Sequence, residues 1–271
     1  MSKNNLKILF LSVEVAPIAK VGGLGDVAGA LPKVLFNSGV DVRICLPFYG
    51  FIDQKKNKIK KIKDNIKVAF GKDEETISIW KTFLDNTKIP VYLIRHKYFN
   101  YKKIYIGGRI KKGDKYTRGK IDTERFSFFT RASLIAAYEL KFVPNVVHAQ
   151  DWHTALAGDY LKTLTKAPTA KTKYPERALD MANFFRNTKT LYTIHNLANQ
   201  GITTPEIIGI SQIDPNLEII KADKKNGDIN FMVQGILGSD LINTVSPRYS
   251  KEILHHYLGA DLDNILQKRQ K

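Results

Sequence analysis

An alternation of short apolar segments with strand character and longer segments with helical spacing is the feature that most constrains this chain. Strands are predicted at residues 6–13, 40–46, 67–70, 76–82, 91–95, 145–149, 189–194 and 241–245. Helices are predicted at residues 27–36, 123–141, 153–163, 228–235 and 247–258. Strands and helices that alternate in this way favour a mainly parallel sheet with helices on both faces, which is an α/β fold.

Several local signals refine this prediction. Residues 6–13 are almost continuously apolar, as expected of a central parallel strand that is buried on both sides. Pro32 is expected to bend or shorten the first helix, because proline cannot donate a backbone hydrogen bond. Ser246 and Pro247 have the residue types of an N-cap and a first helical position. Two of the short strands resemble a hairpin, and residues 98–118 and 166–177 are predicted to be surface loops.

Composition excludes several classes of protein. The formal net charge of +17 comes largely from lysines in residues 55–67 and 102–120, which we interpret as a solvated face. A nucleic-acid partner is not predicted, because no reading module accompanies the charge. The single cysteine, Cys45, cannot form an internal disulfide, and no signal sequence or apolar run of roughly 20 residues is visible. We therefore expect an intracellular protein without a membrane segment.

The glycine-rich motif Lys20-Val21-Gly22-Gly23-Leu24-Gly25-Asp26 follows the first predicted strand and precedes the first helix. Glycines at such a turn allow the backbone to approach a ligand, and the free N–H groups of a helix N-terminus attract phosphate. The spacing fits neither a dinucleotide-binding fingerprint nor a P-loop. From the motif alone, a ligand loop and a tight structural turn both remain open.

Two polar clusters follow later strands. Residues 148–153 contain Asp151 at the end of one strand, and residues 192–201 contain His195 and Asn196 at the end of the next. Open α/β sheets bind ligands at the carboxyl ends of their strands, so both clusters are candidate substrate contacts. The local sequence favours a helix-capping role for Asp151, and a purely structural role for His195 also remains open.

Other kinds of chemistry find little support in the sequence. No His, Cys or Asp group has the local spacing of a closed zinc site, so no metal is predicted. A nucleophile elbow of the G-x-S-x-G type is absent, and Cys45 lies in an apolar strand where a thiol is usually inert. A glycine loop that faces hydroxyl-binding groups suits a sugar, a nucleotide, or both.

These motifs together resemble the glycogen and starch synthases, which are retaining glycosyltransferases that use a nucleotide-activated glucose. The resemblance extends over nearly the whole chain, and the motifs occur in the family's order. They are Leu11-Ser12-Val13-Glu14-Val15-Ala16-Pro17, Lys20 to Val27, Val91-Tyr92-Leu93-Ile94 with Tyr98-Phe99, Glu124-Arg125-Phe126, Asp151-Trp152-His153, Tyr192 to Leu197, and Thr244-Val245-Ser246-Pro247 with Tyr249.

The resemblance implies a GT-B architecture, in which two Rossmann-like domains face each other across a cleft. Residues 1–271 match only the N-terminal, acceptor-side domain. The family's C-terminal domain binds most of the nucleotide-sugar, and its donor-site arginine, lysine and glutamate have no counterparts in this chain. The chain is therefore expected to be inactive alone and to need a C-terminal GT-B domain as its partner.

For the donor, the resemblance implies that Lys20 and the backbone of Gly22 and Gly23 meet its phosphates when the cleft closes. Groups preset for the phosphate charge that grows as the glycosidic bond breaks would stabilise the transition state. Asp26 is expected to hold the loop. Lys20, Asp151 and His195 are the predicted catalytic residues, and no metal or other cofactor is expected.

For the sugars, His195 is expected to contact the donor glucose near its reacting carbon, with Asn196 beside it. Asp151 is expected to orient the acceptor hydroxyls. This sequence departs from the family pattern at Gln150, where histidine is frequent, and at Asn199, where tyrosine is frequent. Such departures could shift acceptor preference without removing a predicted catalytic group.

The predicted function is α-1,4-glucan synthesis, which adds glucose from ADP-glucose to the non-reducing end of glycogen or starch. UDP-glucose is the less favoured donor. The alternative is a non-catalytic glucan-binding or partner module, complemented by a separate donor domain. The expected compartment is the cytoplasm, or a plastid in a plant-type organism, although no transit peptide is seen.

Overall fold

The computed structural model describes residues 6–107, 117–169 and 173–270. Its main sheet has eight strands in the order β10-β7-β6-β1-β2-β5-β4-β3. They are β1 (Lys7–Leu11), β2 (Asp41–Pro47), β3 (Lys60–Phe70), β4 (Asp73–Phe83), β5 (Pro90–Arg95), β6 (Val146–Gln150), β7 (Lys189–Ile194) and β10 (Leu241–Thr244). From β10 to β5 the strands pair in parallel, and β5, β4 and β3 pair antiparallel. A second, two-stranded sheet pairs β8 (Ile202–Thr203) with β9 (Ile229–Asn230).

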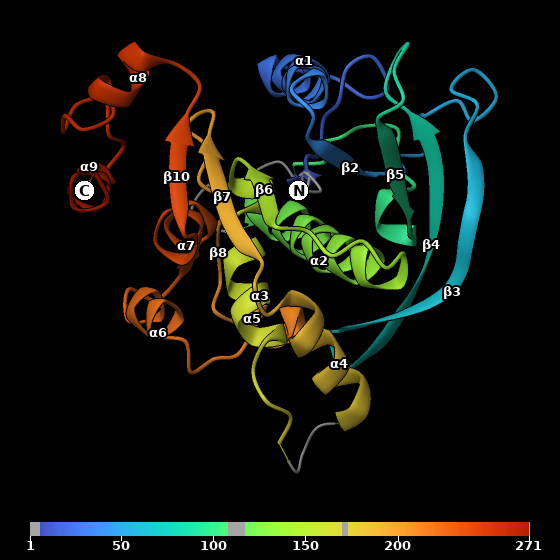
Figure 1. Cartoon of the computed structure of the whole chain (residues 1–271). Coiled ribbons are helices and arrows are strands. Elements are labelled where there is room, and N and C mark those ends of the chain that lie inside the picture. Colours follow the sequence, from blue (N-terminus) through green and yellow to red (C-terminus); the bar gives the residue numbers. More distant parts are fainter. Residues whose placement is uncertain (1–5, 108–116, 170–172, 271) are drawn as a thin grey trace, which may run out of the picture.

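The helices cover this sheet on both sides. They are α1 (Gly23–Asn37), α2 (Thr117–Glu139), α3 (Ala157–Leu164), α4 (Pro175–Phe185), α5 (Glu206–Ser211), α6 (Glu218–Lys224), α7 (Phe231–Gly238), α8 (Pro247–Glu252) and α9 (Asp263–Lys268), with short 3₁₀ helices at Lys97–Phe99 and Trp152–Thr154. Helix α1 packs on β2, α2 packs on β1, β3 and β5, and Figure 1 shows β2 between these two helices. The predicted α/β fold is confirmed.

The central strands lie close to their predicted positions, because strands buried on both faces have a continuous apolar sequence that is easy to recognise. Leu9, Phe10 and Leu11 of β1 have no exposed surface, which explains the continuous apolar run. The hairpin is also confirmed, since β3 and β4 pair antiparallel through a tight connection. Ser246 caps α8 by accepting a hydrogen bond from the Tyr249 N–H.

Some predicted bounds were wrong. Helix α1 begins at Gly23, so the second half of the glycine motif is its first turn, and Pro32 lies inside it without ending it. Strand β3 begins at Lys60, seven residues earlier than predicted, because the first residues of this edge strand are mostly polar and exposed and lack the apolar pattern of a buried strand. Charged side chains on an edge strand discourage pairing with another sheet, which gives part of the lysine-rich stretch a structural role.

The two predicted loops also contain ordered structure. In the first, Ile104 is buried and the half-buried Tyr105 donates a hydrogen bond to Glu14, while residues 108–116 lie outside the described residues. In the second, α4 begins at Pro175, and residues 170–172 lie outside the described residues. Helices α4, α5, α6 and α9 were not predicted, and the final predicted helix ends at Glu252 instead of residue 258.

Asp159 on α3 has a fully buried carboxyl group. Both of its oxygens lack a hydrogen bond among the described residues, where α3 and α7 cross closely at Gly158 and Gly238. Burial raises the pKa of Asp159 to about 7. Because the folded protein holds this proton more tightly than the unfolded chain, the contribution of Asp159 to stability falls as the pH rises from about 4 to about 7.

We therefore expect Asp159→Asn to raise the free energy of unfolding by about 1–3 kcal/mol at pH 8, where the wild-type carboxyl is ionised. The gain should shrink toward zero as the pH falls to about 4. Urea denaturation of both proteins at several pH values measures this. A gain of equal size at every pH, or none at pH 8, would contradict the account of the buried charge.

Candidate active site

The main cavity opens at the carboxyl ends of β1, β6 and β7, where the glycine motif and both polar clusters meet. Its volume is about 760 Å³, within the range of ligand-binding cavities. The residues that line it are Glu14, Gly22, Gly23, Leu24, Val27, Tyr105, Gly107, Asp122, Asp151, Trp152, His153, His195, Asn196, Ala198, Asn199, Gln200, Gly201, Ile202 and Val245. The structure therefore brings together five of the seven predicted site residues from three separate parts of the chain, namely Gly22, Gly23, Asp151, His195 and Asn196.

The glycine motif forms one wall of this cavity. Gly22 is the N-cap of α1, and an added Cβ at Gly22 or Gly23 would meet nothing within 4 Å. No acceptor is recorded for the N–H groups of Gly23 and Leu24 among the described residues, as is usual in the first turn of a helix. Free backbone N–H groups at a helix N-terminus are donors that the oxygens of a phosphate can satisfy.

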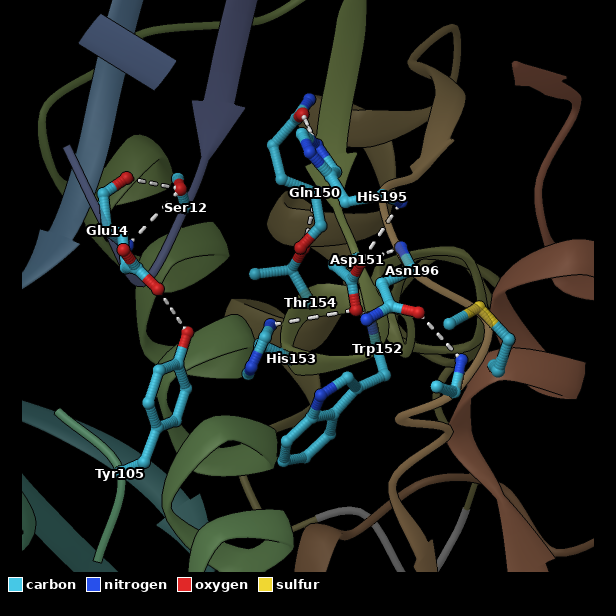
Figure 2. A network of polar contacts seen from close by, with 12 residues as sticks. Ser12, Glu14, Tyr105, Gln150, Asp151, Trp152, His153, Thr154, His195 and Asn196 are labelled. Carbon is cyan, nitrogen blue, oxygen red and sulfur yellow. Dashed lines mark hydrogen bonds and ion pairs between the residues drawn. The ribbon is translucent and has the colours of Figure 1, made fainter. Parts of the chain in front are cut away.

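Glu14 anchors the motif, and the sequence analysis did not assign it a role. Its Oε2 accepts hydrogen bonds from the N–H groups of Val21 (2.7 Å) and Gly22 (2.8 Å), and its Oε1 accepts one from the Tyr105 hydroxyl (2.5 Å). Figure 2 shows Glu14 between Ser12 and Tyr105. The sequence did contain a signal for this role, since Glu14 is the single acidic residue within the apolar segment 11–17. An isolated charge in a buried segment needs hydrogen-bonding partners.

Lys20 and Asp26 pair with each other. Lys20 Nζ lies 2.6 Å from Asp26 Oδ1, and 44% and 60% of these side chains are exposed. Neither residue is among the described residues that line the cavity. An exposed ion pair of this kind contributes little to stability, so Lys20 can exchange Asp26 for another anion at low cost.

Asp151 bridges the ends of β6 and β7. Its Oδ1 accepts a hydrogen bond from the Trp152 N–H (2.7 Å), which is the capping contact that the local sequence favoured. Its Oδ2 accepts from the N–H groups of His195 (3.0 Å) and Asn196 (3.1 Å). The side chain is buried, and burial raises the pKa of Asp151 to about 6 despite these three donors.

His195 lies on the cavity wall and is held by the preceding strand. Its ring Nε2 is 2.8 Å from Oε1 of Gln150, the last residue of β6. Burial lowers the pKa of His195 to about 4, so the ring is neutral at physiological pH. Asn196 is exposed beside it, and its Oδ1 accepts from the Ala198 N–H (2.9 Å).

The aromatic side chains of Tyr105, Trp152 and His153 line part of the cavity. The Trp152 indole lies 4.2 Å from the His153 ring and meets Phe126 edge-on at 5.6 Å, measured between centroids. Gly201 sits against the Trp152 ring, with no room for a side chain between them. Apolar aromatic atoms next to hydrogen-bonding groups are suited to a sugar ring, which has apolar faces and polar edges.

Within the described residues there is neither a cluster of metal ligands nor a membrane-spanning helix. No group of three or more His, Cys, Asp or Glu side chains is arranged to hold a metal ion there. In the same part of the chain, no helix is both long enough and apolar enough to cross a membrane.

Comparison with known proteins agrees with this geometry. The family model of the starch synthase catalytic domain matches residues 7–268. Glycogen synthases from Thermotoga maritima, Thermosipho africanus and Bacillus cereus are 34%, 37% and 37% identical to this chain, over 98%, 97% and 97% of it. The chain spans about half the length of these curated relatives, 50% in each case.

A solved structure gives the same result. The catalytic domain of starch synthase IV from Arabidopsis thaliana, bound to ADP and acarbose, superposes with a TM-score of 0.78 at 25% identity. The superposition covers 98% of this chain and 50% of that one. The fold is therefore that of one half of a GT-B starch synthase catalytic domain. By its sequence match and its fold, the chain belongs to the starch synthase catalytic-domain family.

Proposed function

We propose that this chain is the acceptor-side half of an α-1,4-glucan synthase that transfers glucose from ADP-glucose, with retention, to the non-reducing end of an α-glucan. The observation that supports it best is the single cavity shared by the α1 N-terminus, Asp151 and His195. Glucosyl transfer needs a phosphate site, a sugar site and an acceptor surface in contact, and this cavity has groups suited to all three.

Each wall of the cavity has chemistry for one part of the reaction. The free N–H groups of Gly23 and Leu24, with Lys20 nearby in sequence, would stabilise the charge that grows on the leaving diphosphate. His195 and Asn196 would contact the donor glucose, and the Trp152 ring would support the acceptor. Asp151 would act mainly through the three backbone N–H groups it holds, since its carboxylate is already occupied.

Half of the reaction site would come from a second GT-B domain. We infer that such a domain supplies the remaining donor contacts, because the relatives are about twice as long as this chain. No metal or organic cofactor is required in this proposal. The alternative, a glucan-binding or partner module, keeps the acceptor surface and dispenses with transfer.

Incorporation of labelled glucose from ADP-glucose into glycogen tests the proposal. The assay would compare the 271-residue chain with the whole protein that its gene encodes, and UDP-glucose would serve as the competing donor. We expect incorporation only when a donor-binding domain is present. Glycogen binding without incorporation in every arm would favour the binding module, and the absence of both would overturn the proposal.

A further inference from the structure

Gln150 makes a contact that sets the chemistry of His195. It is the last residue of β6, it has no exposed surface, and its Oε1 lies 2.8 Å from Nε2 of His195. Figure 2 shows the Gln150 amide against the His195 ring, on the side away from Asp151. With the amide in this orientation its carbonyl oxygen faces the ring, and because a carbonyl oxygen accepts hydrogen bonds, this contact selects the tautomer in which Nε2 carries the proton.

The other ring nitrogen is then left as an acceptor. Among the described residues, none donates to or accepts from Nδ1 of His195. A neutral imidazole has one N–H and one lone pair, and the hydrogen bond at one nitrogen decides which is which. With Nε2 engaged by Gln150, the Nδ1 lone pair is free to accept a hydrogen bond from a ligand.

We propose that Gln150 is a positioning residue that fixes His195 as the neutral Nε2–H tautomer and thereby presents Nδ1 as an acceptor for a sugar hydroxyl. This inference rests on the proposed function for the identity of the ligand, but not for the tautomer. It assigns His195 the accepting role toward the hydroxyl, which then donates its proton in the hydrogen bond. A protonated histidine could not accept.

The charged neighbours are compatible with this role. The titratable groups that surround His195 are Glu14 after β1, His148 within β6, and Asp151 and His153 after β6. Asp151 contacts the backbone N–H of His195 and not its ring. Gln150 is therefore the only described side chain that hydrogen-bonds to the ring, and it does not titrate.

Part of this side chain is unsatisfied, which argues for a positioning role. The Gln150 Nε2 is buried and has no acceptor among the described residues. An unpaired buried amide costs free energy, so a residue chosen only for stability at this position would be apolar. A role for the amide oxygen in fixing the tautomer of His195 would explain why this cost is tolerated.

NMR of the ¹⁵N-labelled 271-residue chain tests the proposal without any ligand. Long-range ¹H–¹⁵N spectra distinguish the two tautomers of each histidine, and we expect His195 to be in the Nε2–H form. Gln150→Leu should yield a mixture of both tautomers. Gln150→Glu should raise the pKa of His195 by about one to three units, because it places a carboxylate beside the ring.

His96 supplies an internal control. Its Nε2 contacts Oε2 of Glu75 at 3.1 Å, after β5 and away from Gln150 and His195, so its signals should remain unchanged in both variants. An Nδ1–H tautomer of wild-type His195 would overturn the proposal even if the protein transfers glucose. A clear Nε2–H tautomer would support it even if no transfer is found, so the two ideas fail separately.

Discussion

Replacing Asp151 by alanine is expected to lower the free energy of unfolding by about 3 kcal/mol or more, because three backbone N–H groups lose their acceptor at once. These donors belong to Trp152, His195 and Asn196, and they lie at the ends of two neighbouring strands. Alanine would also have to adopt the positive φ of 60° that Asp151 has. Urea denaturation of the purified variant measures the loss.

A matched control comes from the other acidic residue predicted for the site. Asp26→Ala removes only an exposed ion pair with Lys20, so its effect should stay below about 1 kcal/mol. If Asp151→Ala were as stable as wild type and lost only activity, the carboxylate would be a direct substrate contact and its bridging role would be refuted. Equal losses in both variants would also contradict the argument.

This contrast shows what the sequence could and could not establish. It correctly placed Asp151 and His195 at strand ends, because buried parallel strands have a distinctive apolar pattern. It could not show that the Asp151 carboxylate accepts from the backbone of His195, 44 residues later in the chain. Hydrogen bonds between residues so far apart depend on the register of β6 and β7, which local patterns do not specify.

Glu14 and Tyr105 make the same point more strongly. They are 91 residues apart, and Tyr105 falls in a segment whose glycines and lysines indicated a surface loop. The loop instead contributes a buried hydroxyl to the wall of the cavity. Residues that act through a partner from a remote segment are the part of a site that a single sequence does not reveal, whereas the glycine motif and the strand ends are visible.

Glu14 also changes how the glycine motif must work. The sequence suggested that the backbone of Gly22 and Gly23 would meet phosphate, but the Gly22 N–H is already donated to Glu14. A phosphate that approaches the α1 N-terminus would find the donors of Gly23 and Leu24, and it would also face the Glu14 carboxylate. The Glu14 carboxylate therefore holds the motif in place before a ligand binds. The positive charge of Lys20 would offset its negative charge when a phosphate is present.

Gly201→Ala is expected to destabilise the fold by about 2–4 kcal/mol and to abolish the cavity's affinity for a maltooligosaccharide. Gly201 has a φ of 65°, which alanine adopts at a cost, and the new Cβ would overlap the edge of the Trp152 ring. Displacing this indole would remove the flat surface proposed for the acceptor. Because Trp152 is one of only two tryptophans, fluorescence reports on both unfolding and ligand binding.

Gly209→Ala is the matched control for this substitution. Gly209 lies in α5, and an added Cβ there would meet nothing within 4 Å. Alanine favours a helix more than glycine does, so this variant should equal or exceed wild-type stability by up to about 1 kcal/mol and bind maltooligosaccharide normally. If Gly201→Ala were stable but unable to bind, the Trp152 surface alone would account for affinity. If it bound as well as Gly209→Ala does, the acceptor would have to lie elsewhere in the cavity.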